Sequence, residues 1–461
     1  MLDIKYIREN PEKVKRACYE RGGFSNIDKI LGLDKEMRGL LQRVEQLRAE
    51  QKKLGREHIE QAREIKEELK IRELQLEDVE QQLKVLLYKL PNIPLENVPF
   101  GKDSSENVVL KTWGKIPSFK FEPKDHLELG EALDIIDVKR AAEVSGSRFA
   151  YLKGDAVLLE FALVRLALDT VAKEGFIPII PPALIKEGVA EGLGYWDDEE
   201  GRENYYVIHD TRCYRCGHNL GVSGKSIFCH ECNKLIEQEI TQDERLKCHQ
   251  CGRETRLTSF YLIGTAEHSI APMHSNELLE KLPKRYIGFS SSFRREAGSY
   301  GKDTRGILRV HQFDKLELFS ITKPQESQRE HELLLSLEEK LWQQLKIPYQ
   351  VVQLCVGDMS RPSAATYDIE AWMPGQKRYR EVSSASNTTD FQARRLNIKF
   401  RNKENKMEFV HMLNATGFAI GRTLIAILEN YQQKDGSIKI PKVLQKYAGI
   451  SVIPHRSTGS R

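Results

Sequence analysis

The sequence predicts an α+β protein in which an N-terminal antiparallel α-helical coiled-coil arm precedes a larger domain with a mainly antiparallel sheet. Three observations predict this class. A heptad repeat runs from about residue 30 to about residue 90, strand-like alternating runs follow it, and six cysteines gather in a short interval of the second part. Heptads indicate paired helices, alternation indicates half-buried strands, and grouped CxxC pairs indicate a small metal-stabilised insertion.

Length and composition set the organisation and the class of protein. The 461 residues exceed one compact core, so we expect a helical arm at residues 1–105 and a second domain at 106–461, with a zinc-ribbon-like insertion at 206–257. The net charge of +4 neither demands nor excludes nucleic acid. There is no run of about 18 uncharged apolar residues and no apolar signal-peptide core. We therefore expect a cytoplasmic protein with no membrane contact.

Two heptad seams form the arm. Apolar residues recur at spacings of three and four, with a break after Gly55, and the proline-rich run "LPNIPLENVP" ends the pattern. Each helix has about 25 to 29 residues and so spans roughly 40 Å. The seam positions are Ile30, Leu33, Met37, Leu40, Val44, Leu47, Gln51 and Leu54, then Ala62, Ile65, Leu69, Arg72, Leu76, Val79, Leu83, Leu86 and Leu90.

Such heptads commonly form a dimerisation zipper. Two near-equal halves with a short break and no internal proline favour an intramolecular antiparallel hairpin instead. Basic side chains crowd the half of the arm near the break. They fit a solvated charged face, and they equally fit a rod against which a tRNA-sized polyanion could lie. These residues are Lys52, Lys53, Arg56, His58, Arg63, Lys66, Lys70 and Arg72.

The second domain mixes helical and strand patterns. Residues 154–176 predict a long apolar helix, and "IPIIPP" directly after them predicts a strand start closed by prolines. The later runs "RYIGFSSSF", "QFDKLELFSI", "YQVVQLCV" and "ATYDIEAWM" alternate between polar turns. This alternation favours a mainly antiparallel sheet over a doubly wound one.

Residues 290–320 predict a hairpin with a glycine-rich, basic loop. Side chains alternate along a strand, so both charge signs lie on one face. A solvated outer face explains this pattern, since exposed ion pairs across strands are ordinary. The alternative is a floor for a zwitterionic or polyphosphate ligand, with an aromatic stacking plate. The residues are Ser292, Arg294 and Glu296 on the first strand and His311, Phe313, Lys315, Glu317 and Phe319 on the second.

The cysteine cluster predicts a structural zinc site. Three CxxC pairs are separated by twelve and by fifteen residues, which suits the knuckles of a zinc ribbon. Clustered free thiols are the alternative. Four thiolates leave no open coordination position, so the zinc would be structural. The predicted ligands are Cys213, Cys216, Cys229, Cys232, Cys248 and Cys251.

The number of zinc ions stays open. One ion needs four ligands and leaves a pair over, whereas two ions need eight. A second ion would therefore need histidines such as His209, His218, His230 or His249.

Several segments together resemble the seryl-tRNA synthetase family over nearly the whole chain. "MLDIKYIRENPEKVKRA" with the helical arm resembles its tRNA-binding domain. "GFIPIIPP" is similar to motif 1 of class II aminoacyl-tRNA synthetases, "FRREAGSYGKDTRGILRVHQFDKLE" to motif 2, and "NATGFAIGRTLIAILENYQ" to motif 3. "TAE" at 265–267 and "REVSSASN" at 380–387 complete the set. Any one match is weak, but all of them in order are specific.

The resemblance implies an activity and partners. It implies a class II synthetase antiparallel sheet domain, a homodimer joined through motif 1, and formation of seryl adenylate from L-serine and ATP with Mg²⁺. Transfer of serine to the 3′ end of tRNA(Ser) would follow, and the expectation extends to tRNA(Sec). Alternatives are a paralogue that charges a carrier protein or another amino acid, and an inactive RNA-binding protein. The arm and "TAE" speak against the first, and intact Arg294, Glu381 and Arg422 speak against the second.

The resemblance also implies roles for individual residues. Arg294 would hold the α-phosphate and the serine carboxylate, and Arg422 would contact adenine and the γ-phosphate; these two are the expected catalytic residues. Glu381 and Ser384 would bind phosphate and Mg²⁺. The expected ATP-binding set is Arg294, Glu296, Phe313, Glu381, Val382, Ser383, Ser384 and Arg422, and the expected serine-binding set is Thr265, Glu267, Arg294, Glu317 and Thr416.

The chain departs from the family pattern at three places. Arg295 stands where the family has a small residue, and alternation points it away from Arg294, so we expect little effect. "NATG" replaces "NGSG", and Thr416 keeps the hydroxyl. The cysteine cluster is the third departure, and we do not assign it the direct binding of serine.

Overall fold

The structure is a computed structural model. It describes residues 1–22, 26–54, 58–196, 201, 203–210, 258–296 and 305–455, with five short strands between residues 222 and 255. No helix in these ranges is long and apolar enough to cross a membrane.

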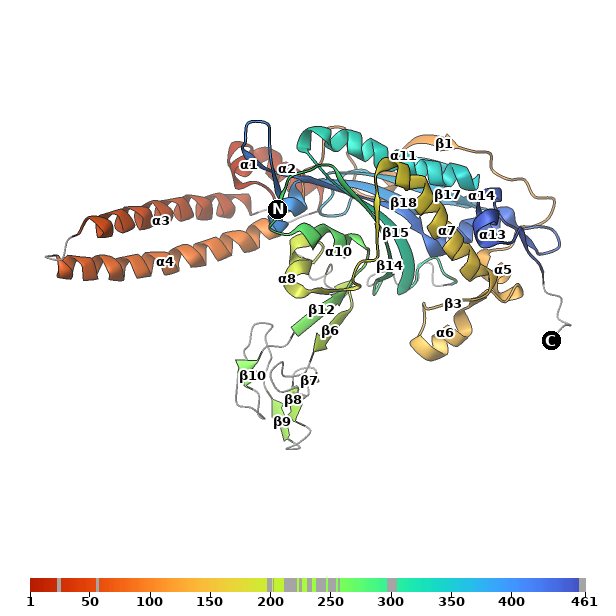
Figure 1. Ribbon diagram of the computed structural model, residues 1–461, viewed down its shortest axis with the longest axis horizontal. Helices are drawn as coiled ribbons and strands as arrows, with labels where there is room; N and C mark the ends of the chain where they lie inside the picture. The colour runs from red at the N-terminus through yellow and green to blue at the C-terminus, as the bar shows by residue number, and fades with distance from the viewer. Residues whose placement is uncertain are drawn as a thin grey trace.

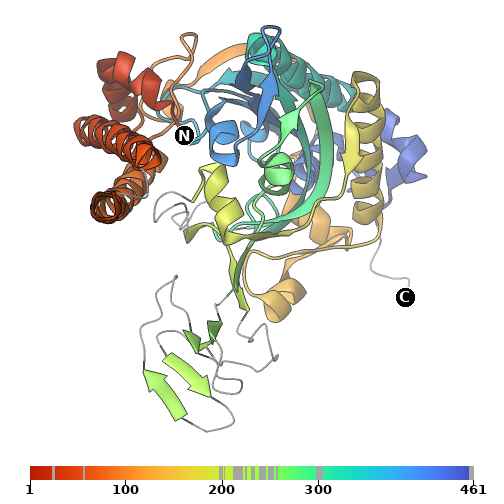
Figure 2. The same cartoon turned by 60° about the vertical axis from the view of Figure 1, so that its left-hand side comes forward.

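The N-terminal part is helical, as the heptads predict. Two long antiparallel helices lie side by side and project from the rest of the molecule (Figures 1 and 2). Seam residues such as Leu33, Val44 and Leu83 are buried between them, and Arg43 donates two hydrogen bonds to Glu68 across the pair, at 3.1 and 3.0 Å. The helices are α1 (Ile4–Glu9), α2 (Pro11–Glu20), α3 (Ile27–Lys53) and α4 (Ile59–Tyr88).

The base of the arm is fastened to the sheet domain by hydrogen bonds. Arg21, at the end of α2, donates to the carbonyl oxygens of Asn92 (2.8 Å) and Ser363 (2.7 Å), and to those of Met359 (3.2 Å) and Ser360 (2.5 Å). Asn92 follows α4, and its side-chain amide donates to the carbonyl of Pro362 at 2.8 Å. Both ends of the arm therefore hold the same loop, residues 359–364.

The second part is built on one eight-stranded sheet. Neighbouring strands run antiparallel throughout, except that β4 pairs parallel with β14. The predicted antiparallel-dominated sheet is confirmed. In order across the sheet, the strands are β1 (Val108–Trp113), β16 (Tyr349–Gln353), β17 (Ala365–Met373), β18 (Arg378–Thr389), β21 (His411–Ala419), β15 (Gln312–Thr322), β14 (Lys284–Phe293) and β4 (Ile177–Ile179).

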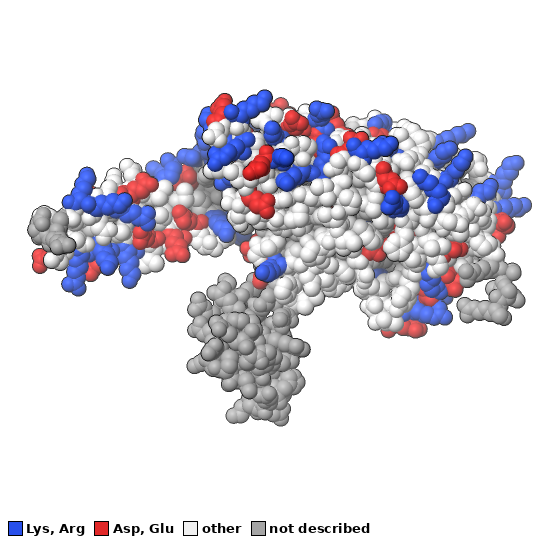
Figure 3. All heavy atoms as spheres, in the orientation of Figure 1, with Lys and Arg blue, Asp and Glu red and all other residues white. Residues whose placement is uncertain are grey.

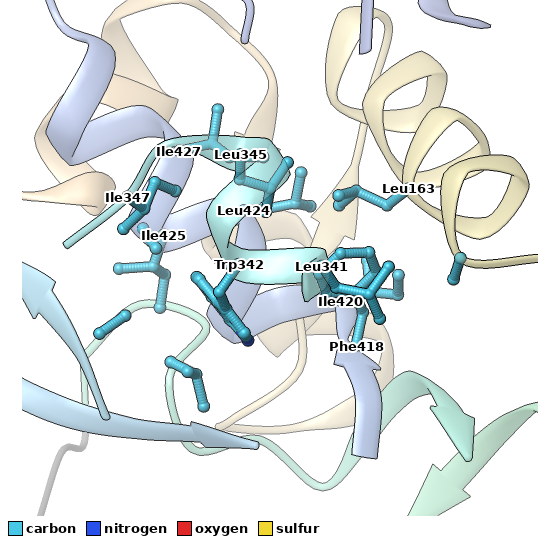
Figure 4. Close-up of a cluster of buried hydrophobic side chains, with 14 of the residues drawn as sticks. Leu163, Leu341, Trp342, Leu345, Ile347, Phe418, Ile420, Leu424, Ile425 and Ile427 are labelled. Carbon is cyan, nitrogen blue, oxygen red and sulfur yellow. The ribbon is translucent and has the colours of Figure 1, made fainter. Parts of the chain in front are cut away.

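Apolar helices pack on one face of this sheet and form the main core. Trp342 of α11 lies among aliphatic side chains of three helices and touches the Phe418 ring of β21 (Figure 4). Each such buried large side chain stabilises the fold by about 1.5–3 kcal/mol. On the opposite face, part of the sheet carries a second apolar cluster that includes Phe319 and Ile321, and the cavity described below occupies another part. The core helices are α7 (Asp155–Val171), α11 (Ser327–Leu345), α13 (Ile420–Tyr431) and α14 (Lys442–Ala448).

Smaller elements frame the sheet and the cavity. They are α5 (His126–Ala132), β2 (Ile136–Asp137), α6 (Val138–Ser145), β3 (Tyr151–Leu152), β5 (Leu184–Lys186), α8 (Glu187–Ala190), α10 (Glu267–Ile270), β13 (Leu278–Leu279), α12 (Phe391–Leu396), β19 (Lys399–Arg401), β20 (Met407–Phe409), β22 (Ile438–Lys439) and β23 (Val452–Ile453). Single-turn 3₁₀ helices are η1 (Ser104–Glu106), η2 (Ala172–Glu174), η3 (Glu191–Leu193), η4 (Ala271–His274) and η5 (Pro324–Glu326).

Two paired strands lead into the cysteine-rich insertion. They are β6 (Val207–Asp210) and β12 (Thr258–Leu262), followed outward by β7 (Val222–Ser223), β8 (Ser226–Cys229), β9 (Lys234–Glu237), β10 (Leu246–Lys247) and β11 (Glu254–Thr255). Of the predicted zinc ligands, Cys213, Cys216, Cys232, Cys248 and Cys251 lie outside the described residues, and the side chain of Cys229 is not described. The zinc site stays a prediction.

Among the register shifts of the sheet, two β-bulges are important for the site. In β18, Ser383 pairs with Ile369 and Glu381 with Glu370, so Val382 is an extra residue. In β21, Phe418 pairs with Leu316 and Thr416 with Glu317, so Gly417 is an extra residue. A bulge changes which side chains share a face, and both bulges lie at the cavity.

Candidate active site

A polar cavity of about 460 Å³ lies on the sheet face opposite the core helices. Seven residues line both this cavity and a narrower, more apolar space of about 70 Å³, so the two spaces are continuous. The combined space suits a small-molecule ligand. It is lined by every residue predicted for serine or ATP except Ser383: Thr265, Glu267, Arg294, Glu296, Phe313, Glu317, Glu381, Val382, Ser384, Thr416 and Arg422.

Arg294, directly after β14, and Phe313 of β15 supply a cationic and an aromatic group. The Arg294 guanidinium lies 5.4 Å from the centre of the Phe313 ring, and its Nε donates to the carbonyl of Gly264 at 3.2 Å. β14 ends at Phe293, so Glu296 does not follow by strand alternation. Glu296 instead adopts a left-handed φ of 53°, a conformation that is uncommon outside glycine. This turn puts its carboxylate beside Arg309, with which it forms an ion pair.

A buried polar triad forms the floor beside these groups. The Thr265 hydroxyl donates to Glu317 Oε2 at 2.7 Å, and Lys315 Nζ donates to Thr265 Oγ1 at 3.3 Å. Lys315 and Glu317 also form an ion pair, with the Glu317 side chain only 1% exposed. The bulge at Gly417 places Thr416 opposite Glu317, and the Thr416 backbone N–H donates to Glu338 Oε1 of α11 at 3.0 Å.

The bulge at Val382 organises the remaining wall. Without it, Glu381 and Ser384 would lie on opposite faces, because they are three residues apart. With it, both line the cavity, while the Ser383 hydroxyl accepts a hydrogen bond from Trp342 Nε1 at 3.1 Å on the core side. The structure therefore does not bring the Ser383 side chain to the predicted ATP-binding set.

Charge pairing fixes the ionisation of this wall. Arg422 Nη1 lies 2.9 Å from Glu381 Oε1 and donates to the Glu381 carbonyl at 3.0 Å. The nearby Arg422 charge lowers the pKa of Glu381, and Glu381 in turn raises the pKa of Arg422. Burial raises the pKa of Asp368, which is the cross-strand partner of Ser384 on β17. Glu381 is thus the ionised carboxylate of this wall at neutral pH.

Glu267 is a second, fully buried carboxylate on the cavity. Gln392 Nε2 donates to its Oε1 at 2.7 Å, and the Tyr195 hydroxyl lies 3.2 and 3.1 Å from its two oxygens. Burial raises the pKa of Glu267 to about 7, while the bond from Gln392 acts in the opposite direction. The Glu267 carboxylate therefore changes ionisation near neutral pH, and its ionised form can pair with a cation.

Several cavity residues were not predicted from the sequence. Arg309 lies four and six residues before Phe313 and Lys315, so a spacing of two was an available signal, although β15 begins only at Gln312. Tyr195 and Ser360 come from segments with no motif of their own. Only the folded chain brings them to the cavity.

The arrangement presents arginines and an aromatic ring at one end and carboxylates, a lysine and hydroxyls at the other. Such a cavity can align a nucleotide with a zwitterion. On the open face of a largely antiparallel sheet, with motifs 1 to 3 in order, it defines a class II aminoacyl-tRNA synthetase. Residues 247–431 match the family model of the tRNA synthetase class II core domain (G, H, P, S and T), and residues 1–94 match that of the seryl-tRNA synthetase N-terminal domain.

Full-length relatives specify the family. The chain is 43% identical to the serine–tRNA ligase of Dictyoglomus thermophilum, over 98% of this chain and 99% of the relative. The crystal structure of seryl-tRNA synthetase from Pyrococcus horikoshii complexed with ATP superposes with a TM-score of 0.82 at 40% identity, covering 99% of this chain and all of that one. Cytoplasmic serine–tRNA ligase from Naegleria fowleri in complex with AMP gives 0.81 at 29% identity, with 99% of each chain covered. The chain belongs to the seryl-tRNA synthetase family.

Proposed function

We propose that this protein is a serine–tRNA ligase, which activates L-serine with ATP and transfers it to tRNA(Ser). The observation that carries the proposal is the single cavity in which Arg294 lies between the Phe313 ring and the Thr265–Glu317 pair. A nucleotide and an amino acid bound there would meet at Arg294. The relatives named above support the same activity.

ATP would occupy the end lined by Phe313 and Arg422. The Phe313 ring offers a stacking face for adenine, and the Glu296 carboxylate can accept from its amino group. Arg294 and Arg422 would bind phosphate oxygens, because a guanidinium binds them bidentately and stays protonated. Val382 would contribute apolar contact to the narrow space.

Serine would occupy the polar end. Its ammonium can pair with Glu267, and its hydroxyl can bond to Glu317 and Thr416. Alanine or glycine would leave these buried groups unpaired, which other polar-pocket enzymes use for discrimination of about 10⁴–10⁵. Threonine would be excluded by size.

The chemical step needs alignment and positive charge more than a base. The serine carboxylate is already a nucleophile: one of its oxygens attacks the α-phosphorus, and pyrophosphate leaves. Arg294 would bind both the carboxylate and the α-phosphate, which holds the reacting atoms together and offsets the charge that builds there.

Two kinds of metal ion complete the proposal. Glu381 and Ser384 offer a carboxylate and a hydroxyl oxygen on the same cavity wall, the hard ligands that Mg²⁺ prefers. Mg²⁺ would neutralise phosphate charge when ATP is bound. Zinc, one or two ions, would hold the cysteine-rich insertion together through its CxxC pairs.

The arm would bind tRNA. Lys and Arg side chains stand along both long helices, most densely toward the free end, with acidic side chains among them (Figure 3). Some of the basic groups are neutralised by neighbours, such as Arg63, whose guanidinium lies 3.9 Å from Glu67. The remaining positive charge would contact phosphates, and the charging of tRNA(Sec) would use the same surface.

We further propose a homodimer in the cytoplasm. Leu158 and Phe161 of α7 are 44% and 61% exposed, and Ile177 and Ile180 after it are 55% and 86% exposed. Ile177 and Ile180 belong to the motif 1 segment and α7 precedes it, and exposed apolar side chains that cluster mark interfaces. Paired CxxC cysteines fit a reducing compartment.

Serine-dependent exchange of pyrophosphate into ATP tests the activity. The wild type should show it, and Arg294→Ala should lower it by at least about 10²-fold, the usual cost of losing a preorganised charged contact. Arg295→Ala is the matched control, because this exposed neighbour lines neither space. Sedimentation should give a dimer for all three proteins. Exchange retained in Arg294→Ala would show that the site is misassigned, and a monomer would remove the dimer proposal.

A further inference from the structure

Helix α12 lies between the N-terminal helices and the cavity. On its outer side, Arg394 Nη2 lies 2.9 Å from Asp3 Oδ2, and Arg395 Nη2 donates to the Tyr88 carbonyl at 2.8 Å. The N-terminal amine of Met1 donates to the Phe391 carbonyl. Segments far apart in the chain thus hold this short helix from outside.

The inner side of α12 carries Gln392, which is fully buried. Its Nε2 donates to Glu267 Oε1 at 2.7 Å and lies 3.3 Å from the Leu193 carbonyl. Because a carbonyl can only accept, this pair of contacts assigns the donor end of the amide to Glu267. Leu193 ends η3, and Tyr195 follows two residues later. The contact between Gln392 and Leu193 joins α12 to the segment that carries Tyr195, and Gln392 and Tyr195 both donate to the Glu267 carboxylate.

We propose that Gln392 and Tyr195 are positioning residues for the amino-acid site, which aim the Glu267 carboxylate at the ammonium of the substrate and keep it ionised. The inference rests on the proposed function, because the ammonium is that of the serine expected there. Gln392 and Tyr195 occupy only some of the acceptor positions of the carboxylate, so the others are left for the ligand.

The electrostatics around Glu267 give the proposal a pH signature. Burial raises the pKa of Glu267 to about 7, and the bond from Gln392 is the largest influence that lowers it. Glu317 raises this pKa, whereas Lys315 and Tyr195 lower it. Among the described residues, the other titratable or charged groups around this end of the cavity are Tyr205, His268 and Arg294.

The sign of the pH effect follows from these contacts. The carboxylate binds a cation only when it is ionised, so affinity for serine is present above the pKa and is lost as pH falls through it. Removing a donor destabilises the ionised form and moves the loss to higher pH. In the pH profile of kcat/KM for serine, this acidic limb reports the ionisation of Glu267 in the free enzyme.

The test compares Gln392→Met with Gln353→Met in serine-dependent pyrophosphate exchange from about pH 6 to about pH 9. Gln353 is a buried glutamine that donates one hydrogen bond to the Asn97 carbonyl at 2.9 Å and lines neither cavity. Gln392→Met should lower kcat/KM for serine about 10- to 100-fold near pH 7, the effect of one lost bond to a charged group. Its acidic limb should move upward, by about one pH unit for a tenfold effect. The KM of Gln392→Met for ATP should stay at the wild-type value. The acidic limb of Gln353→Met should stay at the wild-type pH.

Tyr195→Phe provides a second, milder variant in case Gln392→Met does not fold. It removes only a hydroxyl, and its limb should move in the same direction by a smaller amount. If the variants that fold keep the wild-type limb, or lose activity equally at all pH values, the proposal is wrong. A wild-type protein without serine-dependent exchange would instead refute the proposed function.

Discussion

Arg21 should control how firmly the arm is fastened to the sheet domain. Its guanidinium donates to four backbone carbonyls, of which Asn92 belongs to the segment after α4 and Met359, Ser360 and Ser363 to the loop before β17. Burial, together with the nearby charge of Arg361, lowers the pKa of Arg21 to about 10, so it stays charged at neutral pH. Arg21→Met removes all four donors but keeps an unbranched apolar stem.

The magnitude follows from the contacts that are lost. The contacts to the carbonyls of Asn92, Ser363 and Met359 are partly buried, whereas the Ser360 contact is exposed and can be replaced by water. A fully buried orphaned acceptor costs about 1–3 kcal/mol, so three partly buried carbonyls at about 1 kcal/mol each cost on the order of 2–4 kcal/mol together. The opening equilibrium of this interface should rise about 30- to 1,000-fold, since each 1.4 kcal/mol is tenfold.

Native-state hydrogen exchange reads this opening at two backbone amides. Asn92 N–H donates to the Arg361 carbonyl at 3.0 Å and Leu95 N–H to that of Ala364 at 2.8 Å, so both are protected only while the segment stays docked. Arg16→Met is the matched control, because Arg16 lies on the same helix and its side chain is 78% exposed. Its effect should stay within about 0.5 kcal/mol. Equal exchange at Asn92 and Leu95 in the two variants would refute this account of Arg21.

Two other predictions concern the arm and the insertion. Replacing residues 41–72 by a short glycine–serine turn keeps the buried base of the hairpin, including Leu33 and Leu83. Serine-dependent pyrophosphate exchange should remain within about twofold of the wild type. In contrast, kcat/KM for tRNA charging should fall by about 10²-fold or more, because the phosphate contacts of the arm are lost. Charging that survives would show that the arm does not bind tRNA. Metal analysis of the purified protein should give one or two zinc ions per chain, and fewer in Cys248→Ser; a wild-type protein without zinc would contradict the ribbon.

The order of elements could be predicted from the sequence because it depends on local periodicity. The spacing of three and four predicted two long helices, and they extend over Ile27–Lys53 and Ile59–Tyr88. The run "ATYDIEAWM" predicted a strand, and β17 covers the same nine residues, Ala365–Met373. Apolar periods of 3.6 and 2 are written along the chain itself and need no distant partner. Resemblance to a known family then supplied the candidate site.

The inner arrangement of the site could not be predicted this way. Alternation correctly put Phe313, Lys315 and Glu317 on one face, because β15 is regular there. The same rule does not account for Glu296, which reaches the cavity by a left-handed turn beyond the end of β14. It also does not reveal that the Ser383 side chain faces the core.

The sequence by itself determined the helical arm, the antiparallel strands and the residue types of the site. Tertiary structure decided which of those residues face the ligand. Glu381 and Ser384 share a wall only because Val382 bulges against β17, and Glu267 is held by Gln392 only because α12 is fixed between the N-terminal helices and the cavity. A bulge depends on the register with a partner strand, and a buried hydrogen bond depends on segments far apart in the chain. Neither leaves a local period in the sequence.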